Sequence, residues 1–158
     1  MGFPVWRNLN AMMGMCICND RRWPEVYREM GLQGVELLML GYNTPSVNSQ
    51  MSDEGLEKRL YHSELCMTAG AYQNSTWVIG VAKAGSEDGH PLIGGSIIVD
   101  PDGNVVAKAS SEDDELIVHA CDMEACNFGK STIFDFARHR RIEHYTRIST
   151  QTGVVRPD

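Results

Sequence analysis

The chain has 158 residues, a length typical of one domain, and folding of such a chain buries roughly two thirds of its unfolded surface. Hydrophobic residues make up 42% and charged residues 22% of the sequence, as in ordinary globular proteins, which excludes a disordered chain. The formal net charge of −7 excludes non-specific nucleic-acid binding, because neutralising phosphates requires a dense basic face. The only basic cluster, Arg138-His139-Arg140-Arg141, is interpreted as a solvated helix face.

The sequence also bears on location and cofactors. Its first ten residues, MGFPVWRNLN, lack the basic region and apolar run of a secretory signal, and no stretch reaches the roughly 18 apolar residues of a membrane-spanning helix. The five cysteines are odd in number and none has CxxC spacing to another; they stand at 16, 18, 66, 121 and 126. We therefore expect a soluble, cytoplasmic protein with free thiols, no metal site and no cofactor.

The first predicted elements alternate between strand and helix. The apolar run MMGMCIC at 12–18 favours a buried strand, because a polar cluster follows it directly. A proline in the first turn and a glycine after the last turn predict a short helix over 24–30. A second buried strand is expected at 35–41, and the composition of 43–50 is typical of a loop.

The longest helix is expected to begin at Ser52, as its N-cap, and to end near residue 73. Within it, Ala69-Gly70-Ala71 would allow a neighbouring element to approach closely. A third strand is predicted at 76–85.

The strongest local pattern is SIIVDPDGNVVAKAS at 96–110, which predicts a β-hairpin around Asp100-Pro101-Asp102-Gly103. A further strand is expected at 115–122, a partly helical segment at 123–141 and an extended tail at 154–158. This order predicts an α/β domain, α+β in detail, with helices packed on a mixed β-sheet.

The opening of the first helix suggests a catalytic thiol. A strand followed by Cys18, a tight turn and a helix has the form of a nucleophile elbow, whose backbone N–H groups favour a thiolate and can hold an oxyanion. Arg21 and Arg22 supply planar donors suited to a carboxylate. Spacing alone favours a plainer interpretation, in which Cys16 and Cys18 are small buried strand residues and the arginines are surface charges.

A resemblance changes this balance. The segments CICNDRRWPE at 16–25 and GYNTP at 41–45 resemble the nucleophile region of the nitrilase (carbon–nitrogen hydrolase) superfamily, and more narrowly the N-carbamoyl-D-amino-acid hydrolases. The likeness continues through MTAGAYQN at 67–74, the predicted hairpin and ARHRRIEHY at 137–145. The double arginine after Cys-Asn-Asp is its most specific part.

The resemblance implies a hydrolysis that needs no metal. The Cys18 thiolate would attack the ureido carbonyl of an N-carbamoyl amino acid, ammonia would leave, and water would resolve the carbamoyl thioester. The products would be the free D-amino acid, carbon dioxide and ammonia. The backbone N–H of Asn19 would help to bind the oxyanion.

The resemblance also implies a substrate pocket. Arg21 and Arg22 match the residues that hold the substrate carboxylate, and Asn43 and Thr44 match a polar loop of the same pocket, with Thr44 near that carboxylate. Cys16 matches no residue of known role, and we interpret it as a packing residue.

Two members of the family's Glu–Lys–Cys triad have no match here. In the family, the Glu and Lys motifs precede the nucleophile by many residues, and only 17 residues precede Cys18. We therefore expect residues 1–158 to form the C-terminal portion of a carbon–nitrogen hydrolase domain, part of an α-β-β-α sandwich, and to be inactive in isolation. The family also implies a homo-oligomer that pairs through residues 24–31 and 53–73.

Two other functions remain open at this point. One is a Cys–His hydrolase, although none of the five histidines has a recognisable context and we expect surface or core roles for them; they are His62, His90, His119, His139 and His144. The other is a non-catalytic carboxylate-binding or assembly module that keeps the fold and the two arginines.

Overall fold

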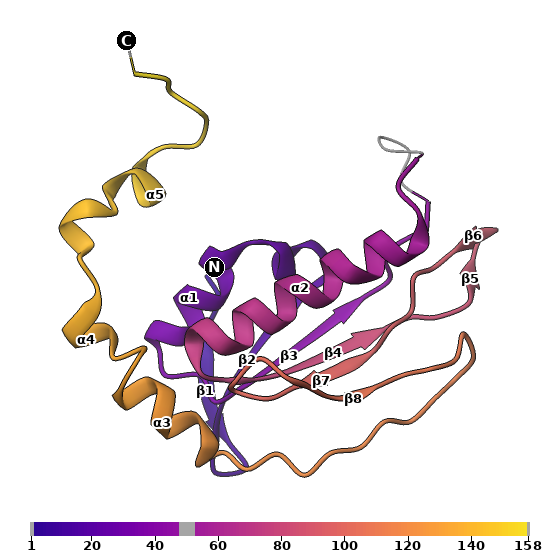
Figure 1. Cartoon of the computed structure of the whole chain (residues 1–158), viewed down its shortest axis with the longest axis horizontal. Coiled ribbons are helices and arrows are strands. Elements are labelled where there is room, and N and C mark those ends of the chain that lie inside the picture. Colours follow the sequence, from indigo (N-terminus) through magenta and orange to yellow (C-terminus); the bar gives the residue numbers. More distant parts are fainter. Residues whose placement is uncertain (1, 48–52, 158) are drawn as a thin grey trace.

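The computed structural model describes residues 2–47 and 53–157. In chain order its elements are β1 (Val5–Asn8), β2 (Ala11–Ile17), the 3-10 helix η1 (Cys18–Arg22), α1 (Pro24–Leu32), β3 (Leu37–Tyr42), α2 (Leu56–Asn74), β4 (Trp77–Ala82), β5 (Ser86–Glu87), β6 (His90–Pro91), β7 (Ile97–Val99), β8 (Val105–Lys108), α3 (Ala125–Ser131), α4 (Phe136–His139), the 3-10 helix η2 (Ile142–His144) and α5 (Thr146–Thr150). Figure 1 shows α2 lying across the main sheet and the C-terminal helices running away from it.

The main sheet has six strands in the order β1-β2-β3-β4-β7-β8, and β5 and β6 form a separate two-stranded ribbon. Strands β2, β3 and β4 are parallel, whereas β1, β7 and β8 run antiparallel to their neighbours. The mixed sheet predicted from the sequence is therefore confirmed. Because parallel strands end at the same edge, the residues after β2 and β3 come close together, and this edge carries the candidate site.

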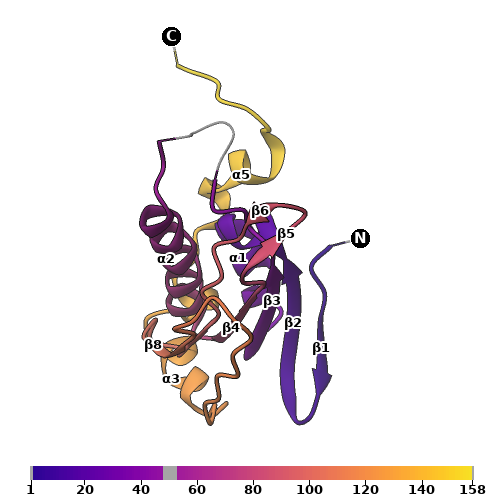
Figure 2. The same cartoon turned by 90° about the vertical axis from the view of Figure 1, so that its right-hand side faces the viewer.

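The main hydrophobic core lies between the sheet and the helices α1 and α2. Alternate side chains of the central strands face the helices, among them Leu38, Leu40 and Val78, and they pack against Met30 of α1 and Met67 of α2. Figure 2 shows α2 on one side of the sheet and the β1–β2 hairpin at its far edge. All five of these side chains are buried, so this core fixes α1 and the turn before it.

A close helix–helix contact explains the small residues predicted within the long helix. A Cβ atom added at Gly70 of α2 would lie 2.4 Å from ring atoms of Tyr27 of α1. Tyr27 is itself buried. The neighbour that approaches Gly70 is thus an element of the same chain.

The other face of the sheet is covered only in part. Trp77 and Ile98 are buried there with Cys126 of α3, and the Trp77 indole donates a hydrogen bond of 2.8 Å to the Asp122 carbonyl. Farther along the same face, one group of apolar side chains is more than half exposed: Met15 (56%), Ile17 (68%) and Val81 (58%). We call these three residues the open face.

Most predicted strands and helices are confirmed, with boundaries that differ by a few residues. α1 continues through Gly31, which packs against Asn74, and ends before Gly34 with its φ of +83°. The expected N-cap, Ser52, lies outside the described residues, and α2 begins after Gly55. Strand β1 was not predicted, because its turn to β2 uses positive φ at Leu9 and Asn10 without a glycine.

The predicted strand at 115–122 is wrong. The segment has no strand structure and runs along the margin of the molecule beside β8 (Figure 1). Its side chains still alternate in exposure: Leu116 and Val118 are exposed, while Ile117 packs on the face of the sheet that carries Trp77. Ile117 is therefore half-buried by packing on a face of the sheet, and residues 115–122 do not pair with an edge strand.

The C-terminal segment is partly helical, as expected, in α3 and α4. The basic cluster is only partly a helix face, because α4 ends at His139 and Arg140 packs over the Tyr145 ring. Arg138, His139 and Arg141 are exposed. Across the described ranges, no helix combines the length and apolar character needed to cross a membrane.

Candidate active site

The chain turns sharply at Cys18, directly after β2. Cys18 has a φ of +48°, in the left-handed region that few non-glycine residues adopt, and it begins η1. The Asp20 carboxylate accepts a hydrogen bond of 2.9 Å from the Ile17 backbone N–H, which closes the turn. A half-buried cysteine at a strained strand-to-helix turn has the geometry expected of a nucleophile elbow.

Arg21 is held at the centre of this site. Its guanidinium donates from Nε to Ser63 Oγ at 3.1 Å, from Nη1 to the Cys18 carbonyl at 2.5 Å and from Nη2 to Thr44 Oγ1 at 2.8 Å. It also lies over the Tyr42 ring, 4.1 Å from the ring centroid. These contacts join the turn after β2, the loop after β3 and helix α2.

The buried charge of Arg21 has no acid to balance it. Its side chain is 1% exposed and makes no ion pair with any residue in the described ranges. Burial lowers its pKa, and the neighbouring Arg22 lowers it further. Two of the five guanidinium N–H groups remain after its three hydrogen bonds, so Arg21 can still bind an anion.

Arg22 lies in a different environment from Arg21. It is exposed whereas Arg21 is buried, although both arginines line a small pocket of about 230 Å³ together with Tyr27, Cys66 and Gly70. The two arginines predicted to hold one carboxylate therefore differ, one fixed inside the chain and one accessible from outside.

The two predicted loop residues, Asn43 and Thr44, also lie in different environments. Thr44 is buried against Arg21, whereas Asn43 is exposed and donates from Nδ2 to Glu87 Oε2 at 3.2 Å. Lys83 donates to the same carboxylate at 2.6 Å, and these hydrogen bonds, that from Lys83 first, lower the pKa of Glu87. The structure thus brings Cys18, Arg21 and Thr44 together.

The remaining predicted residue, Asn19, is exposed within η1, one position after the elbow. Its backbone N–H is that of the residue directly after the Cys18 thiol.

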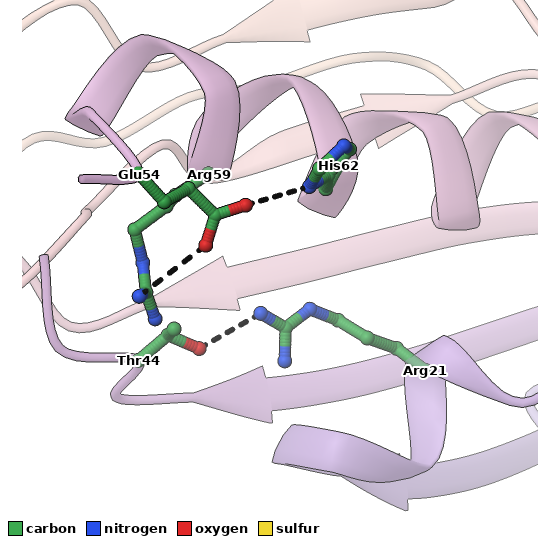
Figure 3. A network of polar contacts seen from close by, with 5 residues as sticks. All are labelled: Arg21, Thr44, Glu54, Arg59 and His62. Atoms are coloured by element: carbon green, nitrogen blue, oxygen red, sulfur yellow. Dashed lines mark hydrogen bonds and ion pairs between the residues drawn. The ribbon is translucent and has the colours of Figure 1, made fainter. Parts of the chain in front are cut away.

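A polar network on α2 was not foreseen from the sequence. Figure 3 shows the Glu54 carboxylate between Arg59 and His62, at 3.6 Å from Arg59 Nη1 and 3.0 Å from His62 Nδ1. Arg59 is buried, and its Nε and Nη1 atoms have no hydrogen-bond partner. Arg59, His62 and Ser63 stand three and four residues apart, so a polar stripe at helical spacing was the available signal.

Three of the other thiols have a raised pKa. Burial, followed by the charge of Asp20, raises the pKa of Cys16 to about 12, and burial raises the pKa of Cys126 to about 11. Burial also raises the pKa of Cys121. Cys16 packs against the core on the helix side of the sheet, which agrees with a packing role.

Three of the five histidines have partners other than a thiol. His62 pairs with Glu54, His119 packs its ring against Trp77 at 5.6 Å, and His144 lies 3.8 Å from Glu143. Residues 2–47 and 53–157 contain no group of three or more His, Cys, Asp or Glu side chains arranged to hold a metal ion.

Comparison with known proteins agrees with the fold. The sequence profile of the family described as carbon-nitrogen hydrolase matches residues 2–130. The chain belongs to the carbon–nitrogen hydrolase family. The resemblance of this carbon–nitrogen hydrolase chain to the nitrilase superfamily is thereby confirmed.

Relatives with names and structures fall in the same superfamily. N-carbamoylputrescine amidase of Arabidopsis thaliana is 31% identical over 160 residues, covering 96% of this chain and 52% of the plant protein. The crystal structure of a carbon–nitrogen hydrolase from Helicobacter pylori G27 superposes with a TM-score of 0.80 at 22% identity, over 96% of this chain and 53% of that one. The NitFhit protein of C. elegans gives 0.72 at 27% identity, over 86% of this chain and 30% of its own. This chain spans about half the length of the curated relatives it matches.

Proposed function

We propose that this carbon–nitrogen hydrolase chain supplies the thiol and the carboxylate-binding part of an enzyme that hydrolyses N-carbamoyl amino acids. The observation that supports this most directly is the bond from Arg21 Nη1 to the carbonyl of Cys18. It places a buried cation next to the elbow that carries the thiol. A substrate carboxylate bound there would lie close to the attacking sulfur.

The chemistry proceeds by a covalent intermediate. The Cys18 thiolate attacks the ureido carbonyl carbon, the terminal NH2 group is protonated and leaves as ammonia, and the carbonyl carbon, still bonded to the amino-acid nitrogen, remains on sulfur as a carbamoyl thioester. Water then attacks this thioester, which returns the thiol and releases the N-carboxy amino acid; this carbamate loses carbon dioxide to give the free amino acid. The backbone N–H of Asn19 stabilises the oxyanion formed in each step.

Charge favours an amino-acid substrate over an amine. N-carbamoylputrescine, which names the plant relatives, ends in an ammonium group that two arginines would repel. An N-carbamoyl amino acid ends in a carboxylate, which the two remaining N–H groups of Arg21 and the exposed Arg22 can bind. We propose the D-enantiomer on the resemblance of the double arginine alone.

The general base and the oxyanion-binding lysine are proposed to come from a segment outside these 158 residues, for which the chain would form the C-terminal portion. Without them, the chain alone would turn over slowly or not at all, since each such group contributes orders of magnitude to the rate. The complete enzyme is proposed to be a homo-oligomer that pairs through α1 and α2.

The test is complementation. The chain is co-expressed with a polypeptide that carries the Glu and Lys motifs of a carbon–nitrogen hydrolase, and ammonia release is measured from N-carbamoyl-D-phenylalanine, its L-enantiomer and N-carbamoylputrescine. We expect turnover of the D-substrate that Cys18→Ala abolishes and Cys121→Ala leaves intact. Turnover of N-carbamoylputrescine alone would contradict the substrate assignment. Saturable binding of the D-substrate without any turnover would instead favour a non-catalytic binding module.

A further inference from the structure

A second cavity lies away from Cys18, between α1 and the C-terminal arm, by which we mean residues 133–149. Its volume is about 570 Å³, enough for an organic molecule of moderate size. The wall from the arm is apolar and open to solvent, since Ile133, Ile142 and Ile148 are all more than half exposed. A cavity of this size with an accessible apolar wall can hold a hydrophobic body.

Two arginines line the same cavity, and each lies over an aromatic ring. The guanidinium carbon of Arg28 lies 4.1 Å from the centroid of the Phe136 ring, and that of Arg140 lies 5.6 Å from the centroid of the Tyr145 ring. A contact with a ring face uses none of the guanidinium's N–H groups in a hydrogen bond to an acceptor atom. Such N–H groups suit bidentate binding of a carboxylate.

The charge of this pair is not balanced within the described chain. Neither guanidinium forms an ion pair with a described residue, and Arg28 Nη1 is buried without a hydrogen-bond partner. Glu25 and Glu29 line the cavity from α1, but neither reaches within ion-pairing distance of the two arginines. Burial lowers the pKa of Arg28, and the charge of Arg140 lowers it further.

We infer that this cavity binds an organic carboxylate with an apolar body, whose carboxylate is held by Arg28 and Arg140 and whose body lies against the isoleucines of the arm. The site is separate from the proposed thiol site and does not depend on the reaction proposed there, but α1, which lines it, is also part of the proposed pairing surface of the homo-oligomer. A carboxylate would supply the acceptor that Arg28 Nη1 lacks and would neutralise two neighbouring like charges.

The experiment uses the full chain and three probes. Binding of 3-phenylpropionate, 3-phenylpropionamide and acetate is measured by titration calorimetry at low salt. We expect saturable binding of 3-phenylpropionate, much weaker binding of the neutral amide because it cannot pair with the arginines, and weak binding of acetate because it lacks the apolar body. Equal affinity for the carboxylate and the amide would overturn the inference.

Variants locate the site. Arg28→Gln and Arg140→Gln should each weaken 3-phenylpropionate binding by about tenfold or more, as expected for loss of a charge-assisted contact. Arg138→Gln is the matched control, because Arg138 is an exposed arginine of α4 that does not line the cavity. If Arg28→Gln fails to fold, Arg140→Gln still decides the question, since Arg140 lies in the surface arm.

Self-association provides the remaining outcome. Sedimentation velocity is run on the chain and on Arg140→Gln without ligand. If the chain binds no 3-phenylpropionate but forms a dimer that Arg140→Gln dissociates, the cavity is an interface between two copies, and the carboxylate site is overturned. A monomer that binds the probe supports it.

Discussion

Arg21 donates a hydrogen bond of 2.8 Å to Thr44, and so ties the turn after β2 to the loop after β3. Both residues are buried, and both follow neighbouring parallel strands. The bond therefore has a structural role in addition to the substrate-binding role proposed for Arg21. It links the segment that carries Cys18 to the rest of the sheet edge, so the site and the local fold depend on the same side chain.

The first prediction concerns this double role. Arg21→Gln should lower the free energy of unfolding by about 2–4 kcal/mol, because several buried acceptors would lose a donor at about 1–3 kcal/mol each. Arg22→Gln is the matched control and should change it by less than about 0.5 kcal/mol, since Arg22 is exposed. Urea unfolding followed by circular dichroism measures both. Equal losses in the two variants would show that Arg21 has no special structural role.

The second prediction concerns the contact between α1 and α2. Gly70→Ala should lower the free energy of unfolding by about 1–3 kcal/mol, because the clash with the Tyr27 ring exceeds the ~1 kcal/mol that alanine gains over glycine within a helix. Gly41→Ala is the control, since no atom lies within 4 Å of a Cβ at that position. Thermal unfolding compares the two. A Gly70→Ala variant as stable as the parent would contradict the packing of these helices.

The third prediction concerns thiol reactivity. At pH 8, iodoacetamide should modify Cys18 well before Cys16 or Cys126, because pKa values of about 12 and about 11 leave few thiolates at the latter two. A raised pKa means that the reactive form appears only as pH rises, so labelling of these two sites should increase about tenfold per pH unit from 8 to 10.

Peptide mass spectrometry measures the labelling in the chain and in Cys18→Ser, which separates Cys16 from its neighbour. Modification of Cys16 at the rate of Cys18 would show that Cys16 is neither buried nor a packing residue.

The fourth prediction concerns the open face formed by Met15, Ile17 and Val81. In the isolated chain, Val81→Lys should change the free energy of unfolding by less than about 0.5 kcal/mol and raise the solubility limit, because it breaks an exposed apolar patch. Val78→Lys is the contrast, since Val78 is fully buried under the helices and its replacement should prevent folding. A free energy of unfolding clearly lower for Val81→Lys than for the parent chain would mean that this face is covered in solution.

The main sheet was predictable because its strands are short apolar runs bounded by polar turns. The Asp100–Gly103 turn shows this best: Asp100 Oδ1 accepts from the backbone N–H groups of Asp102 and Asn104, and Gly103 has a φ of +84°. Strand β1 could not be predicted in this way, since its turn to β2 has positive φ at two consecutive residues, Leu9 and Asn10, and no glycine marks it. The strand predicted at 115–122 is wrong because alternation of apolar and polar residues indicates which side chains are buried and does not indicate whether the backbone pairs with a strand.

The residues of the candidate site could be predicted from the sequence, but their arrangement in space could be predicted only in part. Proximity of Cys18, Arg21 and Thr44 follows from parallel strands that end at one edge. The different surroundings of Arg21 and Arg22 follow from η1, because three residues per turn direct adjacent side chains about 120° apart. Ser63, a bond partner of Arg21, lies 42 positions away on α2, and no local pattern connects the two.

The left-handed backbone at Cys18 has a consequence for engineering this chain. A side chain at a φ of +48° costs of order 1 kcal/mol relative to glycine, so Cys18→Gly should give a more stable protein than Cys18→Ala. A screen that rewards only thermal tolerance would then favour loss of the thiol. Directed evolution of a hardier form must hold position 18 fixed, because stability and reactivity favour different residues there.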